Sequence, residues 1–183
     1  YPIRKNGISC SEARNIEVIN SHFSKRNVLS HKSKWVNFIY GTKALRTLFF
    51  LRFSWIVGIY EPHSPLSLHK STLKKIWEEE PETLNETSLR KFRGKSDVNI
   101  WLVRQWQMME GDFTPRGADF SKLLIMPRDA QKVNEILANP GKCRLLCIND
   151  SNIIEEGADM EIIMADVNKA LSTLLPRKSS FER

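Results

Sequence analysis

Several common functional motifs are missing from this 183-residue sequence. It has three cysteines, an odd number, with neither a C-x-x-C pair nor Cys/His spacing of a zinc site. Cys143 and Cys147 lie in an apolar run, which favours reduced, buried thiols and a cytosolic setting. A Walker loop, a G-x-G-x-x-G motif and a serine nucleophile elbow are also lacking, which excludes the nucleotide-binding and hydrolase classes defined by them.

No apolar run is long enough to cross a membrane. The most apolar stretch, residues 48–60, is about thirteen residues long and contains Arg52, whereas a spanning helix needs roughly 20. We therefore predict a buried segment here, with a monotopic membrane contact as the alternative. The start of the sequence lacks a signal-peptide core and an initiator methionine, so we expect a part of a longer protein.

Acidic residues are nearly absent from the first third of the sequence. Residues 1–60 hold ten Lys and Arg but only two Asp and Glu, a net charge of +8, whereas residues 61–183 carry −1. A basic segment of this kind is compatible with a polyanion, an anionic membrane surface or nucleic acid as partner. The alternative is an ordinary solvated surface.

The spacing of apolar residues predicts an α/β chain. Helical spacing is present at residues 16–23, 35–49 (with a break near Gly41), 64–80, 81–87, 96–111, 128–138 and 160–175. Ser64-Pro65 and Ser96-Asp97 are suitable helix starts, and Gly111 a suitable stop. Apolar runs at residues 120–126 and 143–148 predict strands, the second buried on both faces of a parallel sheet. We therefore predict helices packed on a small, mostly parallel sheet, with a right-handed strand–helix–strand connection.

Polar side chains at the end of the second predicted strand form one candidate site. Asn149 and Asp150 follow the apolar run directly, and ligands in open α/β sheets bind beyond the carboxyl ends of strands. A carboxylate there can hold Mg²⁺ or orient a sugar hydroxyl, and an amide can donate to a phosphate. The alternative is a loop Asn-Asp pair that only caps the following turn.

Two further features carry candidate chemistry. His63 lies between Pro62 and Ser64-Pro65, in a stiff backbone that positions an imidazole able to act as acid, base or phosphate donor. Basic residues precede the predicted helix start at Ser96, where guanidinium groups and a helix N-terminus both favour phosphate; they are Arg90, Lys91, Arg93 and Lys95. The alternatives are a structural histidine and a solvated basic loop.

The order and spacing of these motifs resemble the Stealth family of sugar-1-phosphate transferases. Its third conserved region is similar to Glu61-Pro62-His63-Ser64-Pro65, to residues 81–88 and to Lys91-Phe92-Arg93 with Ser96-Asp97-Val98. Its fourth region is similar to Cys147-Ile148-Asn149-Asp150 and the tail at residues 174–182. The resemblance divides the sequence into a basic lead-in, residues 1–58, and residues 59–183, which carry regions three and four. Regions one and two have no counterpart here.

The resemblance implies the C-terminal part of a nucleotide-sugar transferase-like domain. It implies transfer of hexose-1-phosphate, as N-acetylhexosamine-1-phosphate, from a UDP-sugar to a sugar hydroxyl of a growing capsular polysaccharide. His63 and Arg93 would be catalytic, and Arg90, Asn149 and Asp150 would bind substrate. Asp150 is also the candidate ligand for Mg²⁺, the cofactor that the resemblance implies.

The resemblance also implies a location and a set of partners. We expect a cytoplasmic protein, with a peripheral contact at the inner face of the membrane or with the capsule-assembly machinery. Nucleic acid is not expected as a partner. The rival functions are a non-catalytic scaffold and a basic protein that binds a polyanion or nucleic acid.

Overall fold

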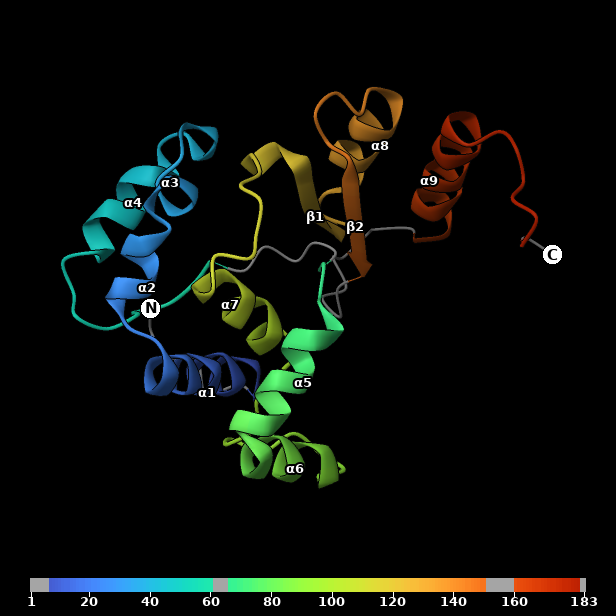
Figure 1. The fold of residues 1–183 in the computed structure, drawn as a ribbon. Coiled ribbons are helices and arrows are strands. Elements are labelled where there is room, and N and C mark those ends of the chain that lie inside the picture. The colour runs from blue at the N-terminus through green and yellow to red at the C-terminus, as the bar shows by residue number, and fades with distance from the viewer. Residues whose placement is uncertain (1–6, 61–65, 151–159, 182–183) are drawn as a thin grey trace. The chain divides into compact units, whose positions relative to one another are not determined.

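The computed structural model describes residues 7–60, 66–150 and 160–181 (Figure 1). These residues divide into two compact units. Residues 7–60 and 66–117 form the first, and residues 118–150 and 160–181 form the second. Each unit has its own hydrophobic core and is described by itself.

Three helices supply most of the core of the first unit: α1 (Gly7–His22), α5 (Lys70–Glu79) and α7 (Trp101–Met109). α6 (Pro81–Leu89) has no buried residue and adds only the partly buried Leu84. α7 packs against both α1 and α5. Its apolar side belongs to the core, where Leu102, Trp106 and Met109 are almost fully buried together with Ile19 and Ile76. The predicted C-terminal stop at Gly111 is confirmed, since Gly111 has a φ of 75°, which favours glycine.

Short elements follow α1 in the same unit: α2 (Lys25–Ser30), α3 (Lys32–Trp35), the 3₁₀ turn η1 (Phe38–Tyr40) and α4 (Lys43–Phe50). α2 begins with a capping box, in which the hydroxyl of Ser24 and the side chain of Asn27 satisfy backbone N–H groups at the helix start. The break predicted near Gly41 is confirmed, since the chain turns there with a φ of 56°. Before the break, however, the chain forms only the short elements α3 and η1 and no longer helix.

The predicted helix start at residue 64 is also wrong. Ser64 and Pro65 lie outside the described residues, but residues 66–69 are not helical and α5 begins at Lys70. The backbone N–H of His69 donates to Oε1 of Gln107 at 3.2 Å, and its imidazole Nδ1 lies 2.7 Å from Oδ2 of Asp112. These contacts with α7 and the residues after it hold the chain extended before α5 starts.

The apolar stretch at residues 48–60 is mostly exposed, so the prediction of a buried segment is wrong. Within it only Ile56 is buried, whereas Leu48, Phe49 and Trp55 are about half exposed. Apolar composition indicated a need for cover, but no residue of α4 is buried. In the part of the chain that the structure describes, no helix is long and apolar enough to span a membrane.

The second unit is a strand–helix–strand–helix arrangement, as predicted. β1 (Ser121–Met126) follows the 3₁₀ turn η2 (Ala118–Phe120), and α8 (Ala130–Ala138) connects it to β2 (Leu145–Asp150), before α9 (Met160–Leu174). The strands are parallel, in register from Ser121 opposite Leu145 to Met126 opposite Asp150. The α/β class is confirmed. Residues 145–148 are only half-buried, so burial of β2 on both faces is not observed.

Candidate functional site: a basic loop and a strand end

The basic loop joins α6 to α7, and it does not lead directly into a helix start. α7 begins at Trp101, whereas Ser96-Asp97 was predicted as its cap. Instead the side chain of Asn99 accepts a hydrogen bond from the backbone of Trp101 at 3.0 Å. Asn15, a fully buried residue of α1, donates to Asn99 at 2.7 Å. This amide pair fixes the helix start, so the helix N-terminus lies further along the chain than the predicted phosphate site required.

Arg90 holds the loop closed. Its Nη1 donates to Oδ1 of Asp97 and to Oγ of Ser96, both at 2.6 Å, and its Nη2 lies 3.2 Å from Oε2 of Glu86. Asp97 is 3% exposed, which explains why it needs a cationic partner. The guanidinium of Arg90 is therefore engaged within the first unit.

Gly94 allows the loop to close around this ion pair. Its backbone N–H donates to Oδ2 of Asp97 at 2.5 Å. A Cβ at residue 94 would lie 2.5 Å from Nη1 of Arg90, closer than two non-bonded atoms approach, so only glycine fits without a shift of the arginine. The backbone of Val98 adds a further bond, to Oγ1 of Thr87 at 3.2 Å. The loop thus has one defined conformation.

Arg93 differs from Arg90 in its surroundings. It lies on the same loop and is exposed, and among the described residues it has neither a hydrogen bond nor an ion pair. A guanidinium with free N–H groups on a fixed backbone can bind a phosphate through two parallel hydrogen bonds. The structure therefore separates the two arginines: Arg90 holds the loop and Arg93 is available to an external anion.

Lys95 and Ser96 form one wall of a surface hollow of about 350 Å³, whose other wall comes from α1. The α1 side is lined by Cys10, Ala13, Arg14 and Glu17, and Arg14 pairs with Glu17 at 3.0 Å. The hollow places a lysine beside the loop that carries Arg93. A hollow lined by both positive and negative side chains can contact a polar group of a ligand.

Sequence reasoning missed the pair formed by His69 and Asp112. The imidazole Nδ1 lies 2.7 Å from the carboxylate, and both side chains are 51% exposed. A carboxylate on one ring nitrogen fixes the orientation of the ring and leaves the other nitrogen for proton transfer. The two residues are too far apart in sequence for spacing to reveal the pair.

At the carboxyl end of β2, the structure places Asn149 opposite Ile125 and Asp150 opposite Met126. They are the last two residues of the strand, so their predicted place at a strand end is confirmed. Asn149 is exposed, which leaves its amide accessible. The side chain of Asp150 lies outside the described atoms, and His63 lies outside the described residues.

Asp129, just beyond the neighbouring strand end, is a second feature that the sequence did not reveal. Its carboxylate accepts hydrogen bonds from the backbone of Ile125 at 3.0 Å and from Arg128 and Lys132 at 2.9 and 3.1 Å. The hydrogen bond from Arg128, followed by those from Ile125 and Lys132, holds the pKa of Asp129 far below its usual range. An aspartate before an apolar helix is typical of a cap, but here it holds the turn after β1.

The described residues do not form a metal centre. They contain no group of three or more His, Cys, Asp or Glu side chains arranged around one point. Asn149 and the strand end offer at most part of an oxygen ligand set for Mg²⁺. Arg90 and Arg93 belong to the first unit, whereas Asn149 and Asp150 belong to the second.

Comparison with known proteins identifies relatives along almost the whole chain. The model of Stealth protein conserved region 3 matches residues 62–110. The chain is 35% identical, over 98% of its length, to 53% of the capsular polysaccharide phosphotransferase WcwK of Streptococcus pneumoniae. It is 37% identical, over 90% of its length, to 48% of the receptor polysaccharide phosphotransferase WefC of Streptococcus gordonii.

A third relative, the exopolysaccharide phosphotransferase cps2G of Lactiplantibacillus plantarum, is 32% identical over 93% of the chain and 50% of that protein. The chain thus spans about half the length of these curated relatives. No solved structure matches it. The resemblance predicted from the third conserved region is confirmed, whereas the fourth region stays a prediction. Residues 62–110 thus match conserved region 3 of the Stealth family, and nearly the whole chain is similar to about half of each of these bacterial polysaccharide phosphotransferases.

Proposed function

We propose that the protein transfers a sugar-1-phosphate from a UDP-sugar to a hydroxyl of a growing polysaccharide. The observation that carries this proposal is the exposed guanidinium of Arg93 on a closed loop. It lies within the matched third conserved region, on a loop closed by Arg90 and Asp97, with its own guanidinium exposed. The three relatives described above are all polysaccharide phosphotransferases, and they suggest the reaction class.

In the proposed reaction an acceptor hydroxyl oxygen attacks the phosphorus that bears the sugar. A new P–O bond forms, the P–O bond to the bridging oxygen breaks, and UMP leaves with that oxygen. The hydroxyl proton passes to a base. The product is a phosphodiester between the transferred sugar and the acceptor, so no oxidant or reductant is needed.

Phosphoryl transfer depends mainly on positioning and charge neutralisation. Arg93 would bind the diphosphate oxygens, and His63 would act either as the base for the acceptor hydroxyl or as a phosphate donor. Asn149 and Asp150 would bind substrate as well. Mg²⁺, which we include as the cofactor of the whole protein, would supply charge neutralisation at the diphosphate.

We propose an N-acetylhexosamine-1-phosphate as the transferred group and the cytoplasm as the location, where UDP-sugars are made. Capsular or other extracellular polysaccharide would be the product. A diphosphate donor suits the guanidinium of Arg93, and a hydroxyl acceptor suits an imidazole such as that of His63.

The test is a product assay with the intact protein, UDP-N-acetylglucosamine, Mg²⁺ and an oligosaccharide acceptor. We expect release of UMP together with a phosphodiester signal in the ³¹P NMR spectrum of the product. Other UDP-hexoses, assayed in parallel, identify the donor. Release of UDP instead of UMP would indicate simple glycosyl transfer and overturn the proposal. An absence of product with every donor would also contradict it.

A further inference from the structure

The first unit carries an exposed apolar surface at α4 and the segments beside it. No residue of α4 is buried. The large exposed side chains of this region are Phe38, Ile39, Leu45, Leu48, Phe49 and Trp55. Phe38 is fully exposed and Leu45 is 66% exposed. Contiguous exposed apolar surface of this kind marks an interaction site.

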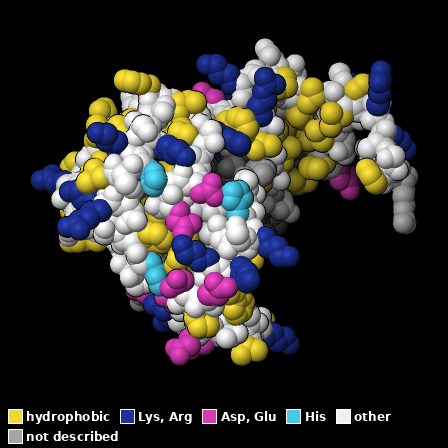
Figure 2. All heavy atoms as spheres, in the orientation of Figure 1, with side chains coloured by type: hydrophobic (Ala, Val, Ile, Leu, Met, Phe, Trp, Pro, Cys, Tyr) yellow, Lys and Arg dark blue, Asp and Glu magenta, His cyan; other side chains and the backbone are white. Residues whose placement is uncertain are grey.

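The same surface is uniformly positive. Residues 18–60 contain seven Lys and Arg and no Asp or Glu, and among the described residues none of the seven is paired with a carboxylate. Figure 2 shows Lys and Arg side chains interleaved with hydrophobic ones over α2–α4. Within the described part of the first unit, no carboxylate therefore neutralises these cations.

The cations lie among the aromatic rings rather than apart from them. Nζ of Lys43 is 4.8 Å from the centre of the Tyr60 ring, and Cζ of Arg52 is 5.3 Å from that of Phe49. Arg46 similarly lies over Phe50, at 5.5 Å. We call the surface formed by Phe38, Ile39, Lys43, Leu45, Arg46, Leu48, Phe49, Arg52 and Trp55 the basic aromatic face.

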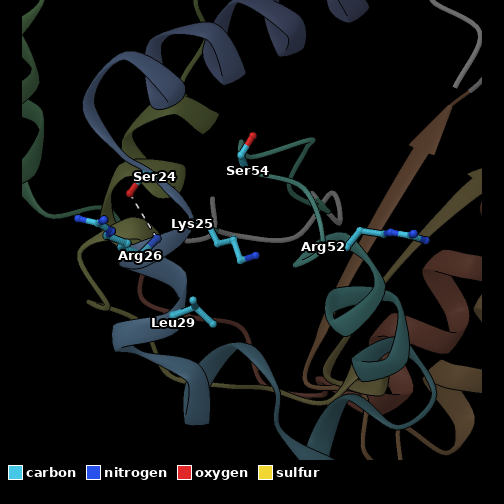
Figure 3. A pocket seen from close by; sticks show the side chains of 6 residues that line it. All are labelled: Ser24, Lys25, Arg26, Leu29, Arg52 and Ser54. Atoms are coloured by element: carbon cyan, nitrogen blue, oxygen red, sulfur yellow. Dashed lines mark hydrogen bonds between the residues drawn. The ribbon is translucent and has the colours of Figure 1, made fainter.

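A surface hollow of about 370 Å³ adjoins this face. It is lined by Ser24, Lys25, Arg26, Leu29, Arg52 and Ser54. Figure 3 shows that the charged ends of Arg26 and Arg52 point in opposite directions, away from Lys25. The three cations therefore do not converge on one phosphate. Their divergence suits a surface with many negative charges better than a single small anion.

Hydrogen bonds hold the base of the face in place. The side-chain amide of Asn20 donates to the carbonyl of Ile56 at 2.9 Å and accepts from its N–H at 2.8 Å. Before α4 in the sequence, the hydroxyl of Tyr40 donates to the backbone carbonyl of Lys34 at 2.7 Å. Nζ of Lys34 in turn donates to the backbone carbonyl of Gly111 at 2.5 Å. The exposed apolar side chains therefore stand on an anchored backbone.

We propose that the basic aromatic face binds the surface of a bilayer that contains anionic phospholipids. Apolar and aromatic side chains would enter the boundary between headgroups and acyl chains, and the cations would contact headgroup phosphates. A second copy of the chain is disfavoured as occupant, because a two-fold interface would place one positive face on another. A nucleic acid or anionic polysaccharide would neutralise the cations but leave Leu45, Leu48 and Phe49 uncovered. This inference does not depend on the reaction proposed above.

The test is co-sedimentation of the intact protein with vesicles of phosphatidylcholine, with and without 30% phosphatidylglycerol. We expect binding only to the vesicles with phosphatidylglycerol, and weaker binding as salt rises, because the ionic contribution is screened. Binding to neither vesicle type, or equal binding to both, would overturn the proposal.

Two matched pairs of variants test the residues. Arg46→Glu should lower vesicle affinity by about fivefold or more, the effect of one cation near an anionic surface, whereas Lys142→Glu, the same charge change at an exposed lysine of the second unit, should not. Leu45→Ser should lower affinity by about tenfold through lost apolar insertion, whereas Leu89→Ser, at an exposed leucine of α6, should not. Equal effects within either pair would contradict the assignment of the face.

Two measurements separate the other outcomes. The first is a fluorescence titration with single-stranded RNA. If Arg46→Glu weakens RNA binding, Leu45→Ser does not, and the protein does not bind vesicles, the partner is a polyanion and the lipid proposal is overturned. UMP release in detergent solution should be the same for wild type, Leu45→Ser and Arg46→Glu. Vesicle binding that persists when UMP release fails would reject the proposed reaction and leave the membrane inference standing.

Discussion

Nη1 of Arg90 lies 2.6 Å from Oδ1 of the buried Asp97, and this ion pair closes the loop that presents Arg93. The two arginines, three residues apart, therefore have different tasks. One maintains the conformation of the loop, and the other has an exposed guanidinium on that fixed conformation. Stability and catalysis should be separable by mutation at these two positions.

Asp97→Ala should destabilise the first unit by about 2 kcal/mol, in the range for hydrogen bonds to charged groups after allowance for the partial exposure of Arg90. The loss leaves the N–H of Gly94 and the Arg90 cation without their carboxylate. Urea unfolding followed by tryptophan fluorescence measures the effect, because Trp106 is buried in this unit. Glu86→Ala removes an exposed partner of the same arginine and should cost less than about 0.5 kcal/mol. Equal losses for the two variants would show that the burial of Asp97 is unimportant.

Arg93→Lys should lower kcat/KM for the UDP-sugar roughly 10- to 100-fold without a change in unfolding free energy. Lysine keeps the charge but lacks the planar fork, and one charge-assisted hydrogen bond contributes about 1.5–3 kcal/mol. Arg90→Lys should instead lower stability and affect kcat/KM less. Steady-state kinetics against donor concentration, with urea unfolding of both proteins, makes the comparison. Wild-type kinetics for Arg93→Lys, or greater damage from Arg90→Lys, would remove Arg93 from the site.

His63→Ala should lower kcat by about 10²-fold or more, the usual contribution of an acid–base group. His69→Ala is the matched control, since His69 is a half-exposed imidazole that has a carboxylate partner in Asp112. We expect a smaller loss of kcat for His69→Ala. If His69→Ala proves the more damaging and His63→Ala turns over normally, the base is the His69–Asp112 pair.

Asp150→Asn should lower activity and leave the melting temperature nearly unchanged, because a carboxylate at the end of a strand contributes little to the core. Asp129→Asn should do the reverse, because the carboxylate of Asp129 accepts hydrogen bonds from Ile125, Arg128 and Lys132. Thermal unfolding and UMP release are measured on both variants. A large melting shift with retained activity in Asp150→Asn would mean that this residue only caps the strand end.

Asp129 should also make stability depend on acidic pH. Its folded-state pKa is lowered, so its stabilising effect is present above the unfolded-state pKa of roughly 3.9 and is lost as pH falls below it. The difference in melting temperature between wild type and Asp129→Asn should therefore be constant near neutral pH and shrink below about pH 4. A difference that stays the same down to pH 2 would contradict the role of the ionised carboxylate.

The second unit was predictable because its signals are local and agree with one another. Two apolar runs separated by an amphipathic segment specify two parallel strands and a crossover helix, and the structure has β1, α8 and β2 in those places. The position of Asn149 and Asp150 at a strand end followed directly. Helices α6 and α8 were also predicted to within a few residues.

Predictions failed where tertiary contacts replaced local signals. Ser96-Asp97 has the composition of a helix cap, but the carboxylate of Asp97 is used by Arg90, and the Asn15–Asn99 pair, 84 residues apart, sets the start of α7. Contacts of His69 with Gln107 and Asp112 delay α5 in the same way. The exposure of Leu48 and Phe49 shows that an apolar sequence indicates the need for a partner and not where that partner lies.

The parallel pairing of β1 with β2 affects how the chain behaves when produced by itself. Among the described residues each strand has one strand neighbour, so each has a row of backbone N–H and C=O groups along its other edge. Such edges accept a further extended segment, from another part of a longer polypeptide or from another molecule. Concentration-dependent self-association of the isolated chain is therefore expected to begin at the edges of this two-stranded sheet.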